Sequence, residues 1–501
     1  MTAQAVPAVP GRSGLRVSAA AAVVAVAAQT FVGLVLYGFL IRKVGAESVG
    51  VWVALLAVGL LACTADMGFS HVLIRRLALA STGTERRTAH EWLETLVWGA
   101  AVLTGAALLS VYLSFGWWSS WMKLAPHAHA EAVRWLPFVL VGLWLNRVAE
   151  TLGGALDGQL RFVERSAAAT CTLVAGLVLT VVSVPTWGMD AAAVVFVVQN
   201  ALLFCANFVL LARGTPGVRW LRPRIRTDIL REAVRYGMSV QALVLCYLVL
   251  ESGIKLFLAG GGHLTAVSYF DLTFRIGKGV RSLLASALRV LVPRLAPATQ
   301  TADGSAVRRS IYARSFGALL VVALPIFVGL LASTHLIAWV VVGRDEPMFV
   351  EALMFALLPW LAYSLTDPAL NLSLASGRLG WPLRGHLATV AAAALLAAWF
   401  GSRTAYVGLY AIVLFAMLLG CVITLAGVHR DENLPWRLLD PSRTALAVLG
   451  GVACGLLGSF APELLHAWNP VLRWMLVAFA YVGFLTLMAW HPSARSLLRR
   501  A

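Results

Sequence analysis

The stretch that decides the fold runs from Glu251 to Arg294 and reads ESGIKLFLAGGGHLTAVSYFDLTFRIGKGVRSLLASALRVLVPR. It predicts the end of one membrane helix, a glycine turn, and a second long helix that carries charges which lipid disfavours. At 100° per residue, these charges fall on one stripe about 60° wide. The stripe consists of Asp271, Arg275, Lys278 and Arg289. An ionisable stripe at membrane depth predicts a water-filled pathway or a binding site that faces the interior of a helix bundle.

The same stretch also allows a purely structural interpretation. Glu251 with Lys255, and Asp271 with Arg275, are i,i+4 pairs that can neutralise each other within a helix. Both interpretations stay open for these four residues. The other two cations of the stripe have no carboxylate one turn away. A surplus of positive charge therefore remains, and it indicates an anionic cargo.

Composition indicates a membrane protein. Of the 501 residues, 60% are hydrophobic and only 13% are charged, and the mean hydropathy is +0.82. Soluble domains do not have this composition, so we predict an all-α polytopic membrane protein. The net charge of +17 would suit nucleic acid, but the arginines concentrate between apolar runs. Positive-inside topology explains them better, and no nucleic-acid partner is expected.

Apolar runs of about 17 to 25 residues predict about fourteen transmembrane helices. Their approximate limits are 17–41, 48–69, 92–115, 134–156, 166–187, 190–212, 238–260, 264–293, 311–336, 349–376, 383–400, 404–427, 444–460 and 469–490. An even number of spans returns both termini to one side of the membrane. Loop arginines and lysines favour that side by roughly three to one, which places both termini in the cytoplasm.

A basic segment, residues 213–237, follows the sixth span and divides the chain. We expect Thr227 to cap a short amphipathic helix there that lies on the anionic inner leaflet. The spans on either side resemble each other, YGFLIRKVGAESVGVWVALLAV against SGIKLFLAGGGHLTAVSYFDLTFRI. This predicts two pseudo-repeated six-helix lobes with the site between them. The predicted domains are a cytoplasmic tail 1–16, an N-lobe 17–212, the linker 213–237, a C-lobe 238–427, and residues 428–501 with two further spans and a cytoplasmic tail.

Several carboxylates at membrane depth are candidates for ion coupling or gating, namely Asp367, Glu150, Asp271, Glu251 and Asp66. The alternative for each is a salt bridge, which we favour for Glu251 and Asp271. Asp367 precedes Pro368, which frees backbone groups, and it has no basic neighbour within a turn. It is therefore the better coupling candidate, whereas Asp66, near the end of the second span, is expected to cap or to gate.

The sequence offers no catalytic or metal-binding pattern. Gly277, Lys278 and Gly279 lack the upstream glycine and the following Ser or Thr of a phosphate-binding loop. The six cysteines lie inside apolar spans without metal-ligand spacing, and His127 and His129 have no further ligands nearby. Non-cytoplasmic loops are short, which is unusual for membrane glycosyltransferases and polymerases. We expect no enzyme, no catalytic residue, no metal and no cofactor, and we expect transport driven by a gradient.

The stretch LIRKVGAESVGVWVALLAVGLLACTADMGFSHVLIRRLA, residues 40–78, resembles the N-terminal signature of the polysaccharide transporter branch of the MOP exporter superfamily, the Wzx-type flippases. The matching features are a basic residue and Gly45 after span one, Gly50 opening span two, and the series Asp66, Gly68, Arg75 and Arg76 closing it. The pieces DILREAVRYGMSV, FDLTFRIG and LVPRLA resemble the same family in the second lobe. The resemblance covers spans one to twelve, and its motifs are diffuse. Val44 and Ala46 stand where the family commonly has Leu and Pro.

The resemblance implies a bacterial inner-membrane protein with both termini in the cytoplasm. Such proteins move an undecaprenyl-pyrophosphate-linked sugar repeat from the cytoplasmic to the periplasmic leaflet, by alternating access through a cationic cavity. In this sequence a pyrophosphate can meet charge-assisted donors from Arg147, Arg275, Lys278, Arg289 and Lys255. The implied partners are this glycan carrier, membrane lipid, and the polymerase and chain-length or export machinery of exopolysaccharide, O-antigen or capsule synthesis.

Three alternatives remain open. A multidrug or cation antiporter of the same superfamily would be expected to have an acid-rich lobe, whereas this interior is net basic. A flippase for the peptidoglycan precursor lipid II shares the predicted architecture. A membrane polysaccharide polymerase or ligase is opposed by the short outer loops.

Overall fold

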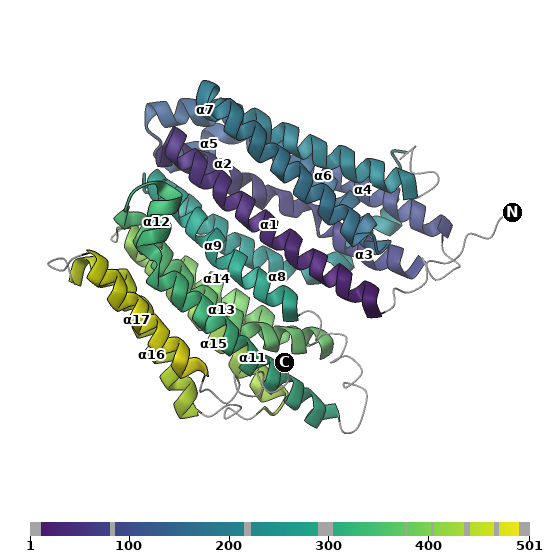
Figure 1. Ribbon diagram of the computed structural model, residues 1–501. Helices are drawn as coiled ribbons and strands as arrows, with labels where there is room; N and C mark the ends of the chain where they lie inside the picture. The colour runs from purple at the N-terminus through teal and green to yellow at the C-terminus, as the bar shows by residue number, and fades with distance from the viewer. Residues whose placement is uncertain are drawn as a thin grey trace. The chain divides into compact units, whose positions relative to one another are not determined.

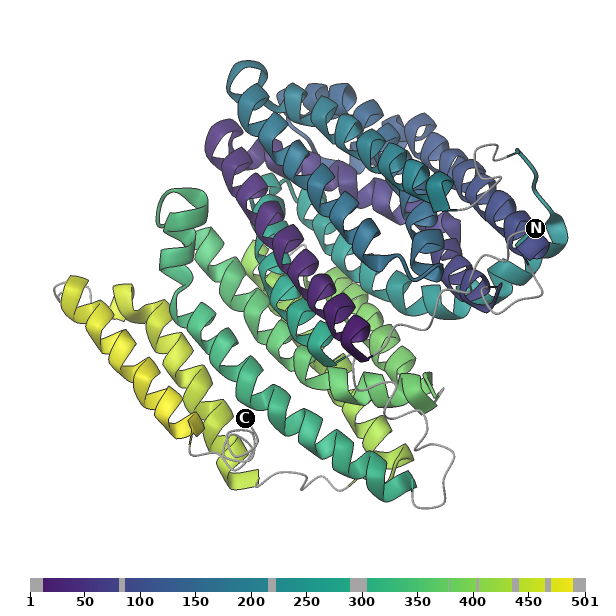
Figure 2. The same cartoon turned by 45° about the vertical axis from the view of Figure 1, so that its right-hand side comes forward.

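The computed structural model describes residues 12–80, 86–214, 222–288, 304–376, 378–401, 405–434, 441–464 and 470–489. Every regular element in these ranges is a helix. Packing divides the chain into two compact units, Met1–Ser268 (unit 1) and Tyr269–Ala501 (unit 2). Figures 1 and 2 show the helices of both units in two views.

Unit 1 contains eight α-helices and two short 3₁₀ helices among its described residues. They are α1 (Arg12–Val44), α2 (Ala46–Ala62), η1 (Cys63–Asp66), α3 (Phe69–Ala80), α4 (Arg86–Leu113), α5 (Phe115–Ser119), η2 (Ser120–Met122), α6 (Pro126–Gly158), α7 (Phe162–Gly214) and α8 (Thr227–Gly260). The 53-residue α7 is interrupted at Gly188, whose φ of 61° lies in the left-handed region. This break separates the two spans that the sequence predicts there.

The second predicted span is broken near its end. After α2 the chain tightens into η1, and Met67 and Gly68 then take positive φ angles of 50° and 73°. The Asp66 carboxylate accepts a hydrogen bond of 3.1 Å from the Gly68 N–H, so it caps this break, as one of the two expected roles requires. Gly237 of α8 packs directly on the Met67 carbonyl, where a side chain would not fit.

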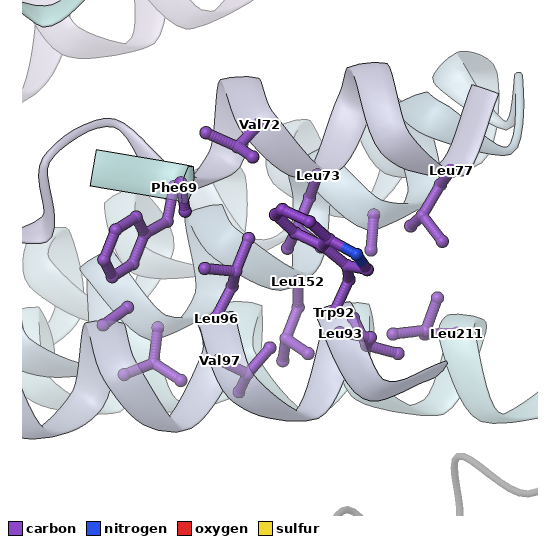
Figure 3. Close-up of a cluster of buried hydrophobic side chains, with 14 of the residues drawn as sticks. Phe69, Val72, Leu73, Leu77, Trp92, Leu93, Leu96, Val97, Leu152 and Leu211 are labelled. Atoms are coloured by element: carbon purple, nitrogen blue, oxygen red, sulfur yellow. The ribbon is translucent and has the colours of Figure 1, made fainter. Parts of the chain in front are cut away.

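The core of unit 1 joins α3, α4, α6, α7 and the start of α8. Figure 3 shows the Trp92 indole of α4 surrounded by leucines of α3, α6 and α7. Members of this cluster recur about every third or fourth residue on α3 and α4, which is the spacing of one helix face. They include Phe69, Val72, Leu73, Leu77, Trp92, Leu93, Leu96, Val97, Leu152 and Leu211.

The structure corrects the expectation for the basic linker. From Thr227 onward it is the first part of α8, and Arg226, not Thr227, holds the N-cap position. Ile229 and Ala233 are buried in the unit 1 core, and Leu230 packs against it, so the apolar face of this segment contacts protein, not the lipid surface. Arg226 also pairs with Glu91 of α4 at 2.6 Å. The segment is docked because its apolar face completes a core that α3 and α4 leave open.

Unit 2 contains the larger part of α9 and seven further helices among its described residues. They are α9 (Leu264–Leu288), α11 (Gly304–Ala332), α12 (Thr334–Val342), α13 (Pro347–Ser376), α14 (Gly380–Phe400), α15 (Tyr406–Asp431), α16 (Pro441–Leu464) and α17 (Pro470–Ala489). Helix α13 packs on α11 and α15, and α14 packs on α15. The last two helices, yellow in Figure 1, pack on each other and on α11.

The chain is an all-helical, multi-pass membrane protein. In the described ranges nine helices are long and apolar enough to span a membrane, and two shorter apolar helices follow. One of the nine is the interrupted α7. The described residues of each of the fourteen predicted stretches fall almost entirely on helices. By packing, α8 belongs to unit 1. The sequence instead predicts a lobe boundary at residues 213–237, before this helix. The limits of the two lobes stay a prediction.

The contact between α14 and α15 gives a test of the packing. In Gly420→Ala the new Cβ would meet the Thr389 hydroxyl and lie 2.7 Å from the Gly385 carbonyl oxygen. We expect a loss of about 1–3 kcal/mol in the free energy of unfolding. Thermal survival of the detergent-solubilised protein, followed by size-exclusion chromatography, measures it. The control is Gly253→Ala in α8, whose Cβ meets nothing within 4 Å; equal losses in both variants would contradict the close α14–α15 contact.

Candidate functional site

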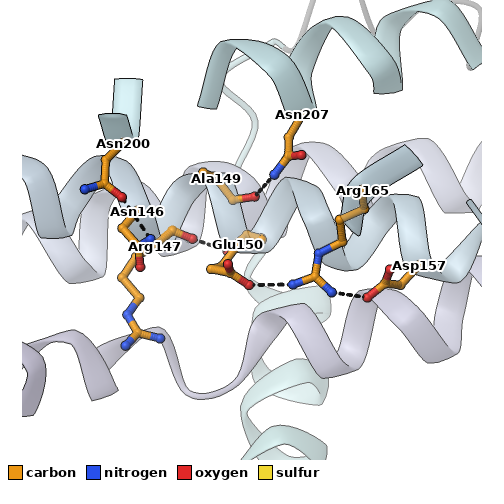
Figure 4. Close-up of polar contacts among 9 residues, drawn as sticks. Asn146, Arg147, Ala149, Glu150, Asp157, Arg165, Asn200 and Asn207 are labelled. Atoms are coloured by element: carbon orange, nitrogen blue, oxygen red, sulfur yellow. Dashed lines mark hydrogen bonds and ion pairs between the residues drawn. The ribbon is translucent and has the colours of Figure 1, made fainter. Parts of the chain in front are cut away.

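A network of charges links α6 and α7 in unit 1 (Figure 4). The Arg165 guanidinium of α7 donates to Glu150 at 2.7 Å and also to Asp157, both on α6. A Cβ on Gly153 would lie 2.6 Å from Arg165 Nε, so a glycine is needed where the arginine crosses α6. Glu150, a candidate for ion coupling, is therefore part of a shared ion pair. Arg165 lies eight residues beyond Asp157 on the next helix, so helix spacing did not predict it as a partner.

Arg147 of α6 points away from that network, as Figure 4 shows. Its guanidinium hydrogen-bonds the Cys63 thiol and interacts electrostatically with Asp66, both in η1. Its Nε atom is buried and has no hydrogen-bond partner. Arg147 thus lies beside the break of the second span, with a donor position that remains open.

Asn146 and Asn207 tie the same part of α6 to α7. The Asn146 side-chain amide donates to the side-chain oxygen Oδ1 of Asn200 at 3.0 Å, and the Asn207 amide donates to the Ala149 backbone carbonyl at 2.9 Å (Figure 4). These bonds satisfy polar groups at membrane depth, where water cannot. They hold α6 and α7 in a fixed register around the charged residues.

The two predicted i,i+4 pairs form. Lys255 Nζ lies 2.7 Å from Glu251 within α8, and both side chains are largely buried. Arg275 Nε lies 2.6 Å from Asp271 within α9, where Asp271 is fully buried and the Arg275 side chain is 39% exposed. The structural interpretation of these carboxylates therefore holds in this conformation. Lys278 lies on the exposed side of α9, and Arg289 lies outside the described residues.

Asp367 has a basic partner that the sequence analysis missed. Its carboxylate accepts a 2.6 Å bond from Arg281 of α9, and it is 3% exposed. The expectation that Asp367 stands apart from basic residues is wrong, because it considered only neighbours on its own helix. Arg281 follows Lys278 of the α9 stripe by three residues, about one helical turn, and that position was the available signal.

The predicted cavity combines Arg147 and Lys255 of unit 1 with Arg275 and Lys278 of unit 2. Its existence as one site stays a prediction. Within each unit, the structure brings the charged residues into pairs across or along helices. Among the described residues, no group of three or more His, Cys, Asp or Glu is arranged to hold a metal ion.

Comparison with known proteins adds family and fold. The family model described as polysaccharide biosynthesis protein matches residues 40–345, more than half of the chain. The chain belongs to the polysaccharide biosynthesis protein family. No match was found among curated protein sequences.

Solved structures with the same fold are transporters. The lipid II flippase MurJ in an inward closed conformation matches with a TM-score of 0.72 and 12% identity, over 97% of this chain and 100% of that one. An inward-facing multidrug resistance MATE transporter of the MOP superfamily matches with a TM-score of 0.60 and 13% identity, over 81% and 94%. A Vibrio cholerae MATE transporter matches with a TM-score of 0.59 and 12% identity, over 84% of this chain and 98% of that one.

Family and fold confirm the resemblance predicted from the sequence. The chain belongs to the polysaccharide biosynthesis protein family, and it has the fold of the lipid II flippase MurJ and of MATE transporters of the MOP superfamily. The identities to the solved structures are low, so these likenesses concern the fold alone.

The Arg165 network predicts a stability effect. Arg165→Ala leaves the Glu150 and Asp157 carboxylates without their cation, and we expect unfolding to become easier by roughly 1–3 kcal/mol. Combining it with Glu150→Gln and Asp157→Asn should recover most of this loss. Arg134→Ala, which removes an exposed pair at 63% and 46% exposure, should cost less than about 1 kcal/mol. Thermal unfolding of the purified variants measures all three; an Arg165→Ala effect no larger than that of the control would contradict the network.

Proposed function

We propose that the protein is a flippase that moves undecaprenyl-pyrophosphate-linked oligosaccharide units from the cytoplasmic to the periplasmic leaflet. The observation that carries the proposal is the cationic side of α9, where exposed Lys278 follows half-exposed Arg275 by one turn. Membership of the polysaccharide biosynthesis protein family supports a glycan cargo. The fold it shares with a protein named as a lipid II flippase supports a cargo that carries a lipid.

The proposal includes the arrangement in the membrane. About fourteen helices cross it, with both termini in the cytoplasm of a bacterial cell. Two lobes of six spans alternate between inward-open and outward-open states, and the two last helices complete the chain. The lipid tail stays in the bilayer, and the lobes enclose the head group and the glycan.

Arg147, Lys255, Arg275 and Lys278 have distinct roles in this proposal. Lys278 has the most accessible ammonium and makes the first contact with pyrophosphate. Arg275 pairs with Asp271 at 2.6 Å and keeps 39% of its side chain exposed, so it contributes its positive charge to the cargo site. Arg147 contributes the donor at its unpartnered Nε. Lys255 is largely buried with Glu251, so its contribution is to the local potential.

Lipid II is the leading alternative cargo, because the protein named as its flippase has the same fold. A drug or cation antiporter is a second alternative, because MATE transporters also share the fold. The net positive side of α9 favours an anionic cargo over a cationic drug. The family favours a polysaccharide precursor over lipid II.

The direct test is the leaflet distribution of lipid-linked sugars in a strain that lacks the protein. We expect complete repeat units on undecaprenyl pyrophosphate to accumulate in the cytoplasmic leaflet only. Leaflet-resolved extraction and mass spectrometry measure this and identify the glycan. Complete units that reach the periplasmic leaflet unpolymerised would point to a polymerase, and an undisturbed pool would point to an antiporter.

Lys278 can be tested separately, because it lies on the exposed side of α9. In a complemented deletion strain, Lys278→Ala should reduce polymer export by at least about tenfold, which corresponds to one lost charge-assisted contact of about 1.4 kcal/mol or more. Lys278→Arg should retain most of the export. The matched control is Lys123→Ala, an exposed lysine after η2. Normal export from Lys278→Ala in correctly inserted protein would show that this side of α9 does not bind cargo.

A further inference from the structure

A second polar cluster in unit 2 involves residues that the cargo proposal does not use. Its centre is the buried ion pair between Arg281 of α9 and Asp367 of α13. The Arg281 guanidinium also lies 4.3 Å from the centre of the Tyr363 ring and 5.9 Å from that of Trp360. Arg281 is therefore held from two sides by α13, through a carboxylate and through aromatic faces.

Tyr363 connects this ion pair to a histidine on α14. The Nδ1 atom of His386 lies 2.7 Å from the Pro382 carbonyl oxygen, which can only accept, so Nδ1 carries a hydrogen. The Tyr363 hydroxyl contacts the other ring nitrogen, Nε2, at hydrogen-bond distance. Since a neutral imidazole has one donor and one acceptor nitrogen, Tyr363 donates and Nε2 accepts. His386 is thus neutral here, and its Nε2 is the basic atom of the cluster.

A small cavity lies beside Tyr363 and His386, between α13, α14 and α15. Its volume is about 10 Å³, close to what a single water molecule requires. Three hydroxyls line it, from Thr366, Thr389 and Thr424, and each donates its hydrogen to a backbone carbonyl of its own helix. Their oxygen lone pairs remain to accept hydrogen bonds. The cavity is thus suited to a donor such as a water or a hydronium ion.

We propose that this cluster is a proton-binding site, with His386 Nε2 as the atom that takes the proton. The proton comes from a water-borne hydronium in the cavity and leaves a water behind. The new Nε2–H then donates to the Tyr363 oxygen, and the Tyr363 hydrogen turns toward the cavity. No bond between heavy atoms forms or breaks, and the cluster gains one positive charge.

The charged and titratable groups around His386 determine what that charge does. Arg281 acts on His386 electrostatically, and both Arg281 and Asp367 act on Cys421 of α15, which also lines the cavity. When His386 is neutral, Arg281 and Asp367 balance each other. When it is protonated, the imidazolium repels Arg281. This repulsion weakens the Arg281–Asp367 pair and loosens α9 from α13.

A proton fits this cluster better than a metal cation does. Among the described residues that line the cavity there is no carboxylate, and the nearby Asp367 is already paired with a guanidinium at 2.6 Å. The cavity has room for about one water, whereas a metal ion needs several oxygen ligands directed at it. A proton needs only the lone pair on Nε2 and a rotation of one hydroxyl.

The proton site would act on cargo through α9. Arg281 follows Lys278 by three residues on the same helix, so a displacement that weakens the Arg281–Asp367 pair also moves the cationic side of α9. This step rests on the proposed function. It assigns the proton gradient as the energy source of transport.

The first experiment measures flipping of lipid-linked glycan in proteoliposomes with and without a pH gradient, and with a sodium gradient as comparison. The wild type should flip several-fold faster with the pH gradient alone. His386→Gln and Tyr363→Phe should flip at a rate that no longer depends on it. The control is His429→Gln, because His429 also contacts a tyrosine hydroxyl, that of Tyr312, at 2.9 Å. Flipping in His386→Gln that responds to the pH gradient as in the wild type would overturn the coupling.

The second experiment needs no cargo. NMR spectra of protein labelled with ¹³C on its histidines give one resonance that is missing in His386→Gln and is thereby assigned to His386. This resonance is followed from about pH 8 to pH 5, the range in which histidine titrates. We expect this resonance to change to that of an imidazolium while the protein remains folded. A His386 that stays neutral over the whole range in folded protein would overturn the proton site. A wild type that flips nothing, with a titrating His386, would overturn the proposed function and leave the proton site standing.

Discussion

Charge inside a membrane bundle needs a partner, and this requirement organises both units of the protein. An unpaired carboxylate or guanidinium at membrane depth costs several kcal/mol, so each is held by another charge or by hydrogen bonds. Glu150 and Asp157 share one arginine, and Asp271 and Asp367 each have their own. The register of α6 against α7, and of α9 against α13, follows from the pairs that join different helices, because moving one helix along its neighbour by a single turn would separate them.

The sequence predicts some of these pairs and not others, for a physical reason. Helix geometry places residues four apart on one face, so the pairs Glu251–Lys255 and Asp271–Arg275 could be anticipated from spacing alone. The pair between Arg281 and Asp367 joins positions 86 residues apart, and only the packing of α9 on α13 brings them together. Spans were predictable because apolar length is a local property. The docking of the first turns of α8 was not, since an amphipathic face does not reveal whether lipid or protein covers it.

The two units use related pairs with the charges exchanged. In unit 1 the acid, Asp66, follows α2 and its cation, Arg147, comes from α6. In unit 2 the cation, Arg281, comes from α9 and the acid, Asp367, from α13. In the predicted lobes these are the second and fourth spans each time. The predicted two-lobe repeat therefore places an electrostatic contact between the second and fourth spans of each lobe, with the acid and the cation exchanged.

Gly277 explains how α9 can pack closely on α13 with one face and keep Lys278 exposed on another. Gly277, Lys278 and Gly279 lack the full pattern of a phosphate-binding loop, and Gly277 instead lies directly against the Trp360 ring, where any side chain would collide. The glycine lets α9 approach α13 closely, and Arg281, four residues further on the same face, therefore meets Asp367. Lys278 follows Gly277 by one residue, so it is turned by about 100° and remains exposed. The face of α9 that carries Gly277 and Arg281 thus packs on α13, and the neighbouring face with Lys278 is exposed. Because a helix moves as a rigid body, a change in the Arg281–Asp367 pair must also displace Lys278.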